Sequence, residues 1–370
     1  MVNVLVVGMS PIIGGIEIFL INVFRKIDKN KIHFDFMTFY PKCAFEKEII
    51  ESGSKIFNFT RRGKNPIKSY FEQKKFFKNN KKTYDFVWIH LSSSSNIITN
   101  KLAKKYTNAK VISHCHGIDF ESKPGIVRKT HTILSKINFN RFIKCTDYAF
   151  ACSQAAGEWL FKEKKEVIII KNGIETEKFL FENQIRNQIR KELKLNEDTF
   201  VIGHVGRFCE AKNHDFLIDV YKEYYKKNSN SALVLVGTGD LEEEIKQKVK
   251  DYKLEQNVKF LGYRNNINEI YNIFDVFVLP SLFEGFPISA IEAQANALPC
   301  ILSDTITREV DMIKNIVFLP IDNCFAWSDA IMSINEFDRE KHTNNNKIIE
   351  AGYDLNSTKN FLENFLKSKK

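Results

Sequence analysis

The sequence predicts an α/β protein made of two Rossmann-like, doubly wound domains. Short runs rich in Val, Ile and Phe alternate with longer amphipathic segments from end to end, which is typical of strands and crossover helices in parallel sheets. A length of 370 residues favours two domains over one. A turn signal at Asn172-Gly173, followed by a polar stretch, separates two series of strand candidates. Two such sheets that face each other can enclose one ligand in the cleft between them.

The expected strands are short, and helical segments connect them. The first series comprises 2–7, 33–39, 55–59, 85–90, 110–114, 148–152 and 167–170. The second comprises 200–205, 232–236, 258–261, 276–279, 299–302 and 316–319. We therefore expect an N-terminal domain over residues 1–172 and a C-terminal domain over 173–353. The segment 354–370 is expected to be a helix that either caps the second domain or crosses back to the first.

Composition narrows the class of protein. Hydrophobic residues form 44% of the chain and charged residues 27%, which excludes general disorder. The net charge of +10 fits a phosphate-rich partner or a membrane surface, and a chain-wide bias towards Lys and Asn explains it equally well. No nucleic-acid-binding motif is present. Scattered cysteines, no signal-peptide pattern and no long apolar run predict a cytoplasmic protein without a transmembrane helix.

The most informative stretch is 274–295, in which a buried strand is followed by a loop and a helix. Pro287 suits the first turn of that helix, and the free amides that follow it would form an anion site. Glu284 and Glu292 flank this site. Two carboxylates beside an anion site fit a ligand whose neutral part carries hydroxyls, such as a sugar. The structural alternative is that Glu284 is only a charged loop residue and Glu292 only a solvated residue of the helix.

Other strand ends carry glycines and cations. Arg207 and Lys212 follow the strand 200–205, where charge-assisted hydrogen bonds suit a diphosphate. Glycines that permit close backbone approach follow three strands, and they are Gly14, Gly15, Gly206 and Gly237. Their spacing is not G-x-G-x-x-G, which counts against NAD. Surface cations and structural turns remain the alternative explanation.

A histidine pair, His114 and His116, ends the strand 110–114. A metal site is disfavoured because no third or fourth ligand can be identified. No Asp-x-Asp occurs in the chain, which disfavours a metal-chelated diphosphate. A structural histidine is the alternative here too.

Taken together, these motifs resemble the retaining glycosyltransferases of family 4, which have the GT-B fold, and their bacterial capsule and exopolysaccharide branch in particular. The motif that carries the resemblance is Glu-x7-Glu, from Glu284 to Glu292. In the family's order it is accompanied by Gly14-Gly15-Ile-Glu17, Asn172-Gly173-Ile174, Gly206-Arg207 with Lys212, Gly237-Thr-Gly239 and Leu261-Gly-Tyr263-Arg264.

The resemblance implies transfer of a hexose or N-acetylhexosamine, with retention, from a UDP-sugar to a lipid-linked saccharide. It implies that Glu284 contacts the donor sugar and Glu292 the ribose, while Arg207 and Lys212 neutralise the diphosphate. His116 would reach towards the reacting sugar, which makes His116, Glu284, Arg207 and Lys212 the expected catalytic residues. The other donor-binding positions it implies are Gly14, Gly15, Gly206, Gly237, Tyr263, Arg264, Gly285, Phe286, Pro287 and Ile288. It also implies that the C-terminal helix returns to the first domain.

Several points stay open. Ile288-Ser289-Ala290 replaces bulkier residues of the family, so the donor sugar is not fixed. A sugar-nucleotide epimerase of the same architecture, or a non-catalytic sugar-nucleotide-binding subunit, would use the same donor site. No metal or other cofactor is expected, because two cations and helix amides take over charge stabilisation.

The segment 61–82 predicts contact with an anionic membrane. It holds nine cations against one acid, Glu72, so its net charge is +8 in 22 residues. Tyr70, Phe71, Phe76 and Phe77 are interleaved with the cations, as in a helix that lies at an interface. A soluble basic helix whose aromatic residues face the core is the alternative. The prediction implies a protein held at the inner face of the cell membrane.

Overall fold

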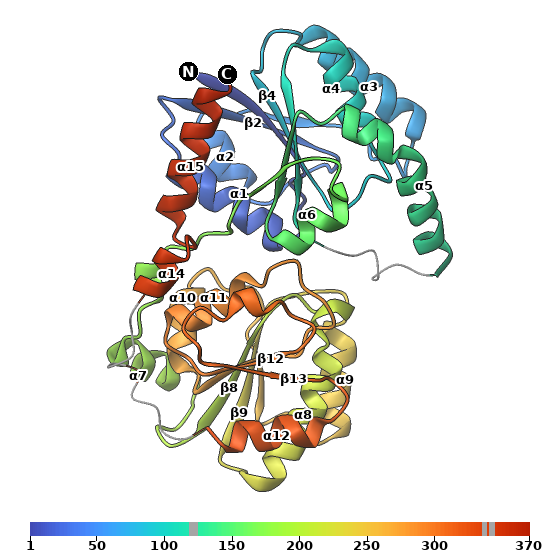
Figure 1. The fold of residues 1–370 in the computed structure, drawn as a ribbon. Helices are drawn as coiled ribbons and strands as arrows, with labels where there is room; N and C mark the ends of the chain where they lie inside the picture. The colour runs from blue at the N-terminus through green and yellow to red at the C-terminus, as the bar shows by residue number, and fades with distance from the viewer. Residues whose placement is uncertain (118–124, 335–338, 340–344) are drawn as a thin grey trace. The chain divides into compact units, whose positions relative to one another are not determined.

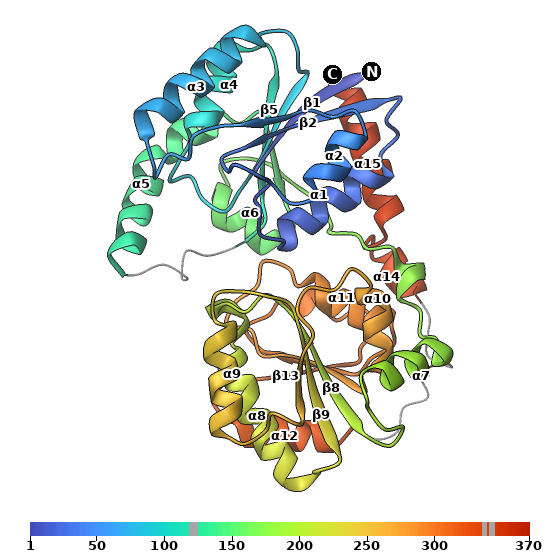
Figure 2. The same cartoon turned by 180° about the vertical axis from the view of Figure 1, so that it is seen from behind.

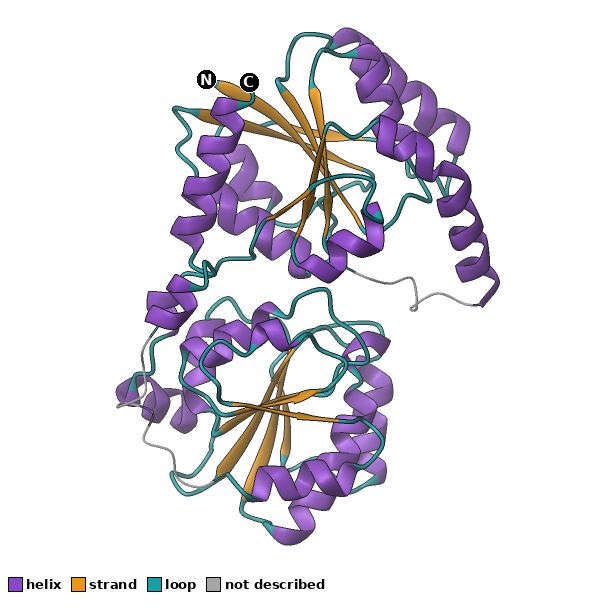
Figure 3. Cartoon of the chain, in the orientation of Figure 1, coloured by secondary structure: helices purple, strands orange, loops and turns teal. Residues whose placement is uncertain are grey.

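A computed structural model describes residues 1–117, 125–334, 339 and 345–370. The chain divides into two compact units (Figure 1). Unit 1 is Met1–Gly173 together with Leu355–Lys370, and unit 2 is Ile174–Asp354. Each unit has a parallel sheet covered by helices on both faces (Figure 3), as the alternating sequence pattern predicts. The predicted fold class, two Rossmann-like α/β domains, is confirmed.

Unit 1 contains a seven-stranded sheet in the order β3-β2-β1-β4-β5-β6-β7. Its strands are β1 Val2–Val7, β2 Ile32–Thr38, β3 Ile56–Asn58, β4 Phe86–Leu91, β5 Lys110–Cys115, β6 Tyr148–Ala151 and β7 Val167–Ile169. Its helices are α1 Gly15–Lys26, α2 Glu46–Glu51, α3 Pro66–Asn79, α4 Ile98–Tyr106, α5 Gly125–Lys144, α6 Gln154–Phe161 and α15 Leu355–Ser368. The predicted strands of this unit are all found, and their ends differ from the prediction by at most one residue.

The two faces of this sheet pack against different helices because side chains alternate along a strand. Val4 and Val6 of β1 belong to one core cluster, together with Phe19 of α1 and Phe365 of α15. Leu5 and Val7 of the same strand belong to the core cluster on the opposite face of the sheet, together with residues of α3 and α4. Figure 2 shows the two sets of helices on opposite sides of the sheet. The C-terminal helix α15 is thus an integral part of unit 1, and its Glu363 accepts a hydrogen bond from the Asp28 amide.

Unit 2 contains a six-stranded sheet in the order β10-β9-β8-β11-β12-β13. Its strands are β8 Phe200–Val205, β9 Ser231–Val236, β10 Val258–Phe260, β11 Val276–Leu279, β12 Cys300–Ser303 and β13 Ile316–Leu319. Its α-helices are α7 Asn183–Glu192, α8 His214–Lys227, α9 Glu242–Asp251, α10 Ile267–Ile270, α11 Ile288–Ala295, α12 Cys324–Met332 and α14 Asn346–Glu350. Short 3-10 helices span Thr176–Phe179, Glu210–Lys212, Tyr271–Ile273 and Arg308–Val310. The chain leaves unit 1 after Gly173 and returns to it at Leu355.

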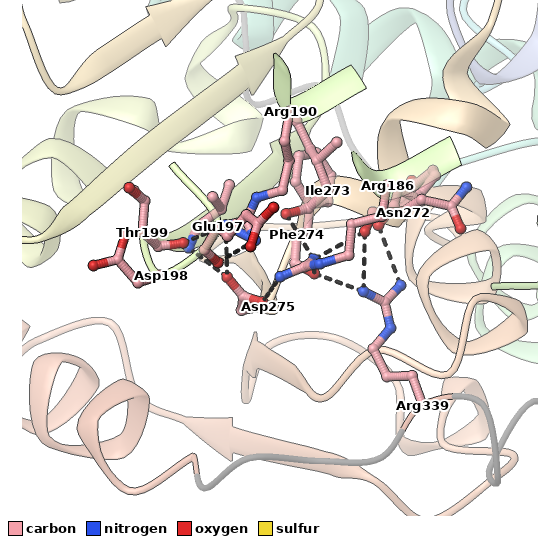
Figure 4. Close-up of polar contacts among 12 residues, drawn as sticks. Arg186, Arg190, Glu197, Asp198, Thr199, Asn272, Ile273, Phe274, Asp275 and Arg339 are labelled. Atoms are coloured by element: carbon pink, nitrogen blue, oxygen red, sulfur yellow. Dashed lines mark hydrogen bonds and ion pairs between the residues drawn. The ribbon is translucent and has the colours of Figure 1, made fainter. Parts of the chain in front are cut away.

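Arginines anchor the segment that leads into β11 (Figure 4). Arg186 of α7 donates to the Phe274 carbonyl and forms a 2.6 Å ion pair with Asp275. Arg339 donates to the same carbonyl at 2.7 Å. Burial lowers the pKa of Arg190, which also contacts Asp275, to about 10, so it stays charged at neutral pH. These contacts fix the start of β11, and the loop that follows this strand carries Glu284.

The basic helix α3 differs from its predicted arrangement. Phe77 is fully buried, and Phe76 packs partly buried against the same core cluster. The expectation that all four aromatic residues face an interface is therefore wrong for these two. The core-facing positions Ser69, Gln73 and Phe77 recur every fourth residue, and two of them are polar, which hides the buried face in the sequence. Tyr70 and Phe71 are exposed.

Within the described part of the chain, no helix has the length and hydropathy that a membrane crossing would need.

Candidate active site

In unit 2, the loops that follow β8, β9, β10 and β11 lie at the carboxyl edge of the sheet and are tied together by backbone hydrogen bonds. The Gly206 amide donates to Val236, and the Gly237 amide to Gly262. The Leu282 amide donates to Ala211, which connects the Glu284 loop to the Lys212 loop. The carboxyl edge of a parallel sheet is where α/β proteins bind ligands.

Two of the predicted donor glycines have structural reasons to be glycine. Gly237 has a φ of +138°, and a Cβ there would lie 2.1 Å from the Gly206 carbonyl oxygen. A Cβ on Gly206 would lie 2.9 Å from His204 Nε2. Close packing of the loops therefore explains both residues without a ligand, and their predicted contact with a donor stays a prediction.

The structure brings Lys212 and Glu284 together, 72 positions apart in the chain. Lys212 Nζ lies 2.6 Å from Glu284 Oε1, and the Ser281 hydroxyl donates to the same oxygen at 2.6 Å. The two charged side chains are only 17% and 13% exposed. An ammonium and a carboxylate thus stand side by side at the sheet edge, able to meet a phosphate and a hydroxyl of one ligand.

The helix α11 begins next to this ion pair, at Ile288, with Pro287 as its N-cap residue rather than its first residue. No side chain caps its first amides, so they remain available to an anion. Phe286 is buried and stacks on Tyr353 at a ring separation of 4.8 Å. Gly285 precedes it in the loop.

Glu292 lies one turn into α11 and has a partner that the sequence did not reveal. The Tyr271 hydroxyl donates to Glu292 Oε2 at 2.8 Å. Burial raises the pKa of Glu292 to about 7, although the Tyr271 hydrogen bond and the charge of Lys212 oppose that rise. Tyr271 belongs to a short 3-10 helix before β11, and no motif marks it. The site therefore contains a carboxyl group that titrates near neutral pH, as functional carboxylates often do.

The other predicted unit 2 residues, Arg207, Tyr263 and Arg264, are exposed or half-buried. Arg207 is exposed and makes no hydrogen bond or ion pair with any residue that the structure describes. Tyr263 is 44% exposed, and Arg264 Nε donates to Asn266 at 3.2 Å. All three follow strands at the same carboxyl edge. Arg207 is thus free to contact a ligand without breaking an internal contact.

Unit 1 has its own set of predicted residues at the carboxyl edge of its sheet. Gly14 is the N-cap of α1, and its amide donates to the buried Glu17 carboxylate at 3.1 Å. The Ser10 amide donates to the same carboxylate. A Cβ on Gly15 would meet no atom within 4 Å. Internal packing therefore does not require glycine at position 15, unlike positions 206 and 237.

This openness makes Gly15→Ala a clean test of ligand approach. We expect the variant to melt at the wild-type temperature and to lose at least about tenfold in kcat/KM for the donor, because the methyl group would occupy the space of a phosphate. Gly63→Ala, at another glycine with open space, is the matched control. Wild-type kinetics in Gly15→Ala would contradict the prediction that this backbone contacts the donor.

His116 pairs with His90, a residue that sequence reasoning missed. His90 Nδ1 lies 2.7 Å from His116 Nε2, so only Nδ1 of His116 is left for another partner. Burial lowers the pKa of His116 to about 3, which keeps it neutral at pH 7. His114 is fully buried and stacks on Trp88, so His116 is the better placed of the two candidates. His90 and His116 meet because β4 and β5 are neighbouring strands in the sheet, and this adjacency cannot be predicted from the sequence.

The three histidines also form the cluster that comes nearest to a metal site among the described residues. Their ligand atoms lie within 4.8 Å of one another. One nitrogen of His90 and one of His116 are already joined by the hydrogen bond. The prediction of a metal-independent enzyme stays a prediction.

Comparisons with known proteins agree with this arrangement. The family model described as "Glycosyltransferase Family 4" matches residues 13–178, and the one described as "Glycosyl transferases group 1" matches residues 185–354. EpsF of Bacillus subtilis (strain 168), named as a glycosyltransferase, is 35% identical over 305 residues, which are 80% of this chain and 78% of EpsF. An Escherichia coli UDP-Gal:alpha-D-GlcNAc-diphosphoundecaprenol alpha-1,3-galactosyltransferase is 32% identical over 243 residues, 64% of this chain and 61% of its own.

A similar fold occurs in Alr3699/HepE of Anabaena, solved with UDP and glucose. It has a TM-score of 0.80 at 19% identity and covers 100% of both chains. The fold and the matches define a glycosyltransferase of the GT-B type. The chain belongs to glycosyltransferase family 4.

Proposed function

We propose that this glycosyltransferase transfers a hexose or N-acetylhexosamine, with retention, from a UDP-sugar to a lipid-linked saccharide in capsule or exopolysaccharide synthesis. The observation that carries the proposal is the Lys212–Glu284 pair beside the free amides of α11. A sugar diphosphate needs both cationic donors and a hydroxyl acceptor, and this edge of unit 2 offers both. The E. coli relative uses UDP-Gal and a diphosphoundecaprenol acceptor by its name, and this supports the choice of substrates.

The proposed reaction uses front-face attack. The bond from the sugar's anomeric carbon to the diphosphate oxygen breaks as the acceptor hydroxyl bonds to that carbon from the same face. The acceptor's proton goes to the departing diphosphate oxygen. Arg207, Lys212 and the α11 amides stabilise the negative charge that develops on the diphosphate. His116 supplies Nδ1 to the reacting sugar, and Glu284 accepts from a sugar hydroxyl once the donor displaces Lys212.

This scheme assigns charge stabilisation to the chain itself, so we expect activity to survive chelation. The rate of transfer should be unchanged within about twofold after treatment with excess EDTA and desalting. Arg207 and Lys212 supply the positive charge that a metal ion would otherwise supply. The measurement is the initial rate of UDP release with and without added magnesium or manganese. Complete loss after chelation, restored by either ion, would show that a metal is needed.

We further propose that α3 holds the enzyme against an anionic membrane. Lys68, Lys75 and Lys78 are exposed on this helix, and Ile67 and Phe71 are 69% and 59% exposed. Cations next to exposed apolar side chains suit the headgroup region, at about 1 kcal/mol per engaged Lys or Arg. A lipid-linked acceptor would be reached from this surface.

Sedimentation with vesicles tests the membrane proposal. The wild type should pellet with anionic vesicles, not with neutral ones, and high salt should release it. Replacing Lys74, Lys75, Lys78, Lys81 and Lys82 by Gln should abolish pelleting. The matched control replaces five lysines of unit 2 by Gln, of which four are exposed and Lys259 is half-buried: Lys191, Lys194, Lys250, Lys253 and Lys259. Unchanged pelleting of the α3 variant would exclude this helix as the anchor.

The proposed activity itself is tested with a panel of nucleotide sugars. One UDP-sugar should raise the melting temperature of the purified protein and be consumed when a diphosphopolyprenol-linked saccharide is added. Slow isomerisation of the donor, without transfer, would instead indicate an epimerase. Stabilisation by the donor with no turnover under any condition would indicate a binding subunit.

A further inference from the structure

Unit 1 contains a cavity that neither the motifs nor the proposed donor site uses. It has a volume of about 100 Å³ and lies between α5, α6 and the loop that follows β4. Phe139 of α5 and Trp159 and Leu160 of α6 line it, and its wall is largely apolar. An apolar cavity of about 150 Å³ can hold benzene. This cavity therefore has the size of a branched unit of four or five carbon atoms.

The polar groups around the cavity hold its walls in place. The Trp159 indole Nε1 donates to the Ser92 carbonyl at 3.1 Å, and the Ser94 hydroxyl donates to the Ser135 carbonyl at 3.2 Å. The Ser135 hydroxyl is buried beside the cavity and has no partner among the described residues. The walls are thus tied to each other by hydrogen bonds, and what they present to the cavity is mostly carbon.

Cations stand at the same cavity. Lys136 and Lys162 are exposed and line it, and Lys162 Nζ lies 5.4 Å from the centre of the Phe139 ring. Neither lysine forms an ion pair with an acid that the structure describes. The whole of α5, Gly125–Lys144, contains five Lys or Arg and no Asp or Glu. An apolar wall next to unpaired ammonium groups fits an amphiphile whose hydrocarbon begins directly after an anion.

The cavity is also close to the histidine pair. The loop that forms one wall starts directly after β4, the strand that carries His90. A Cβ on Gly117, the neighbour of His116, would lie 3.9 Å from the Ser92 hydroxyl. The cavity and the sheet edge that carries His116 therefore share the loop that follows β4.

We propose that this cavity binds the first isoprene unit of a polyprenyl diphosphate, with Lys136 and Lys162 on the diphosphate. The proposal rests on the proposed function in taking a lipid-linked saccharide as the acceptor, and it adds the site that recognises the lipid. The branched five-carbon unit matches the volume and the apolar wall, and the diphosphate matches the cations. The attached saccharide would then extend from the cavity towards the reaction site.

The test measures the binding of farnesyl diphosphate to the full chain in the absence of any donor. Calorimetry and tryptophan emission are the two readouts. Trp159 is 39% exposed, whereas Trp88 and Trp327 are fully buried, so a change in emission reports on the cavity. We expect saturable binding that is at least tenfold tighter than binding of inorganic diphosphate. Equal affinity for the two probes would overturn the proposal, because the hydrocarbon would then contribute nothing.

Variants of cavity residues test whether farnesyl diphosphate binds in the cavity. Ser135→Leu should fill the cavity and weaken farnesyl diphosphate at least tenfold, while Ser135→Ala, the matched control, should bind as the wild type does. The melting temperature of Ser135→Leu should not fall, since the leucine replaces an unpartnered hydroxyl. Should it fall, the exposed pair Lys136→Gln and Lys162→Gln provides the second test, and wild-type affinity in that double variant would overturn the proposal. Stabilisation by UDP, measured on the same samples, should not change, which separates a failure here from a failure of the proposed donor site.

Discussion

We expect Arg207→Ala to lower kcat/KM for the donor at least about tenfold, equivalent to roughly 1.4 kcal/mol of transition-state stabilisation. Arg207 is exposed, and its side chain makes no hydrogen bond or ion pair with the described residues that the substitution would remove. The melting temperature should therefore stay at the wild-type value. The measurements are donor kinetics and thermal unfolding of the same preparation.

Lys212→Ala should lower kcat/KM at least as much, but it also breaks the 2.6 Å ion pair with Glu284 and should lower the melting temperature slightly. Lys226→Ala is the matched control, because it breaks an ion pair of the same length, with Glu223, on α8. Loss of activity in the control would indicate a general effect of removing a lysine. Wild-type kinetics in both Arg207→Ala and Lys212→Ala would remove the proposed diphosphate site.

Glu292→Gln should make the protein more stable and less active at pH 8. The pKa of Glu292 is raised to about 7 from 4.5, so the folded protein holds a proton between these pH values that the unfolded chain releases. Stability therefore falls as the pH rises from 4.5 through 7 in the wild type, and Gln removes this loss. The difference in melting temperature, variant minus wild type, should grow between pH 5 and pH 8.

Kinetics separate this stability effect from function. In the wild type, the donor KM should rise as the pH falls from 8 to 6, because a protonated Glu292 accepts hydrogen bonds from ribose hydroxyls less well. The variant should show a high KM with no such pH dependence. A Tyr271→Phe variant should shift the wild-type profile to higher pH, since it removes the hydrogen bond that favours the carboxylate. A pH-independent KM in the wild type would contradict the assigned role of Glu292.

The sequence was sufficient for the fold and for the expectation that Lys212 and Glu284 follow strands at one sheet edge, where the structure pairs them. Runs of Val, Ile and Phe mark the strands, and in a parallel sheet every strand ends at the same edge, so the loops that carry Lys212 and Glu284 were expected at one edge. Contacts between elements that are neighbours in space could not be predicted from the sequence. The pairing of His90 with His116 depends on β4 lying beside β5, and no local pattern specifies that adjacency.

Other misses have equally specific causes. Tyr271 meets Glu292 because a 3-10 helix packs against α11, and isolated tyrosines carry no signal of such a contact. The cations that surround Phe76 and Phe77 in the sequence predict an interface for these two side chains. Their helix instead turns a face with Ser69 and Gln73 towards the core, where Gln73 accepts from Thr99 at 2.8 Å. The cavity beside Trp159 needs three segments to come together and was not visible in the sequence.

The central claim, retaining transfer from a UDP-sugar to a lipid-linked saccharide, is tested most directly by the anomeric configuration of the product. The purified enzyme is incubated with an α-linked UDP-sugar and a diphosphopolyprenol-linked saccharide, and the new linkage is read by NMR. We predict an α-linkage to the acceptor saccharide. A β-linkage, or a donor that is isomerised or hydrolysed while the acceptor stays unmodified, would contradict the proposal.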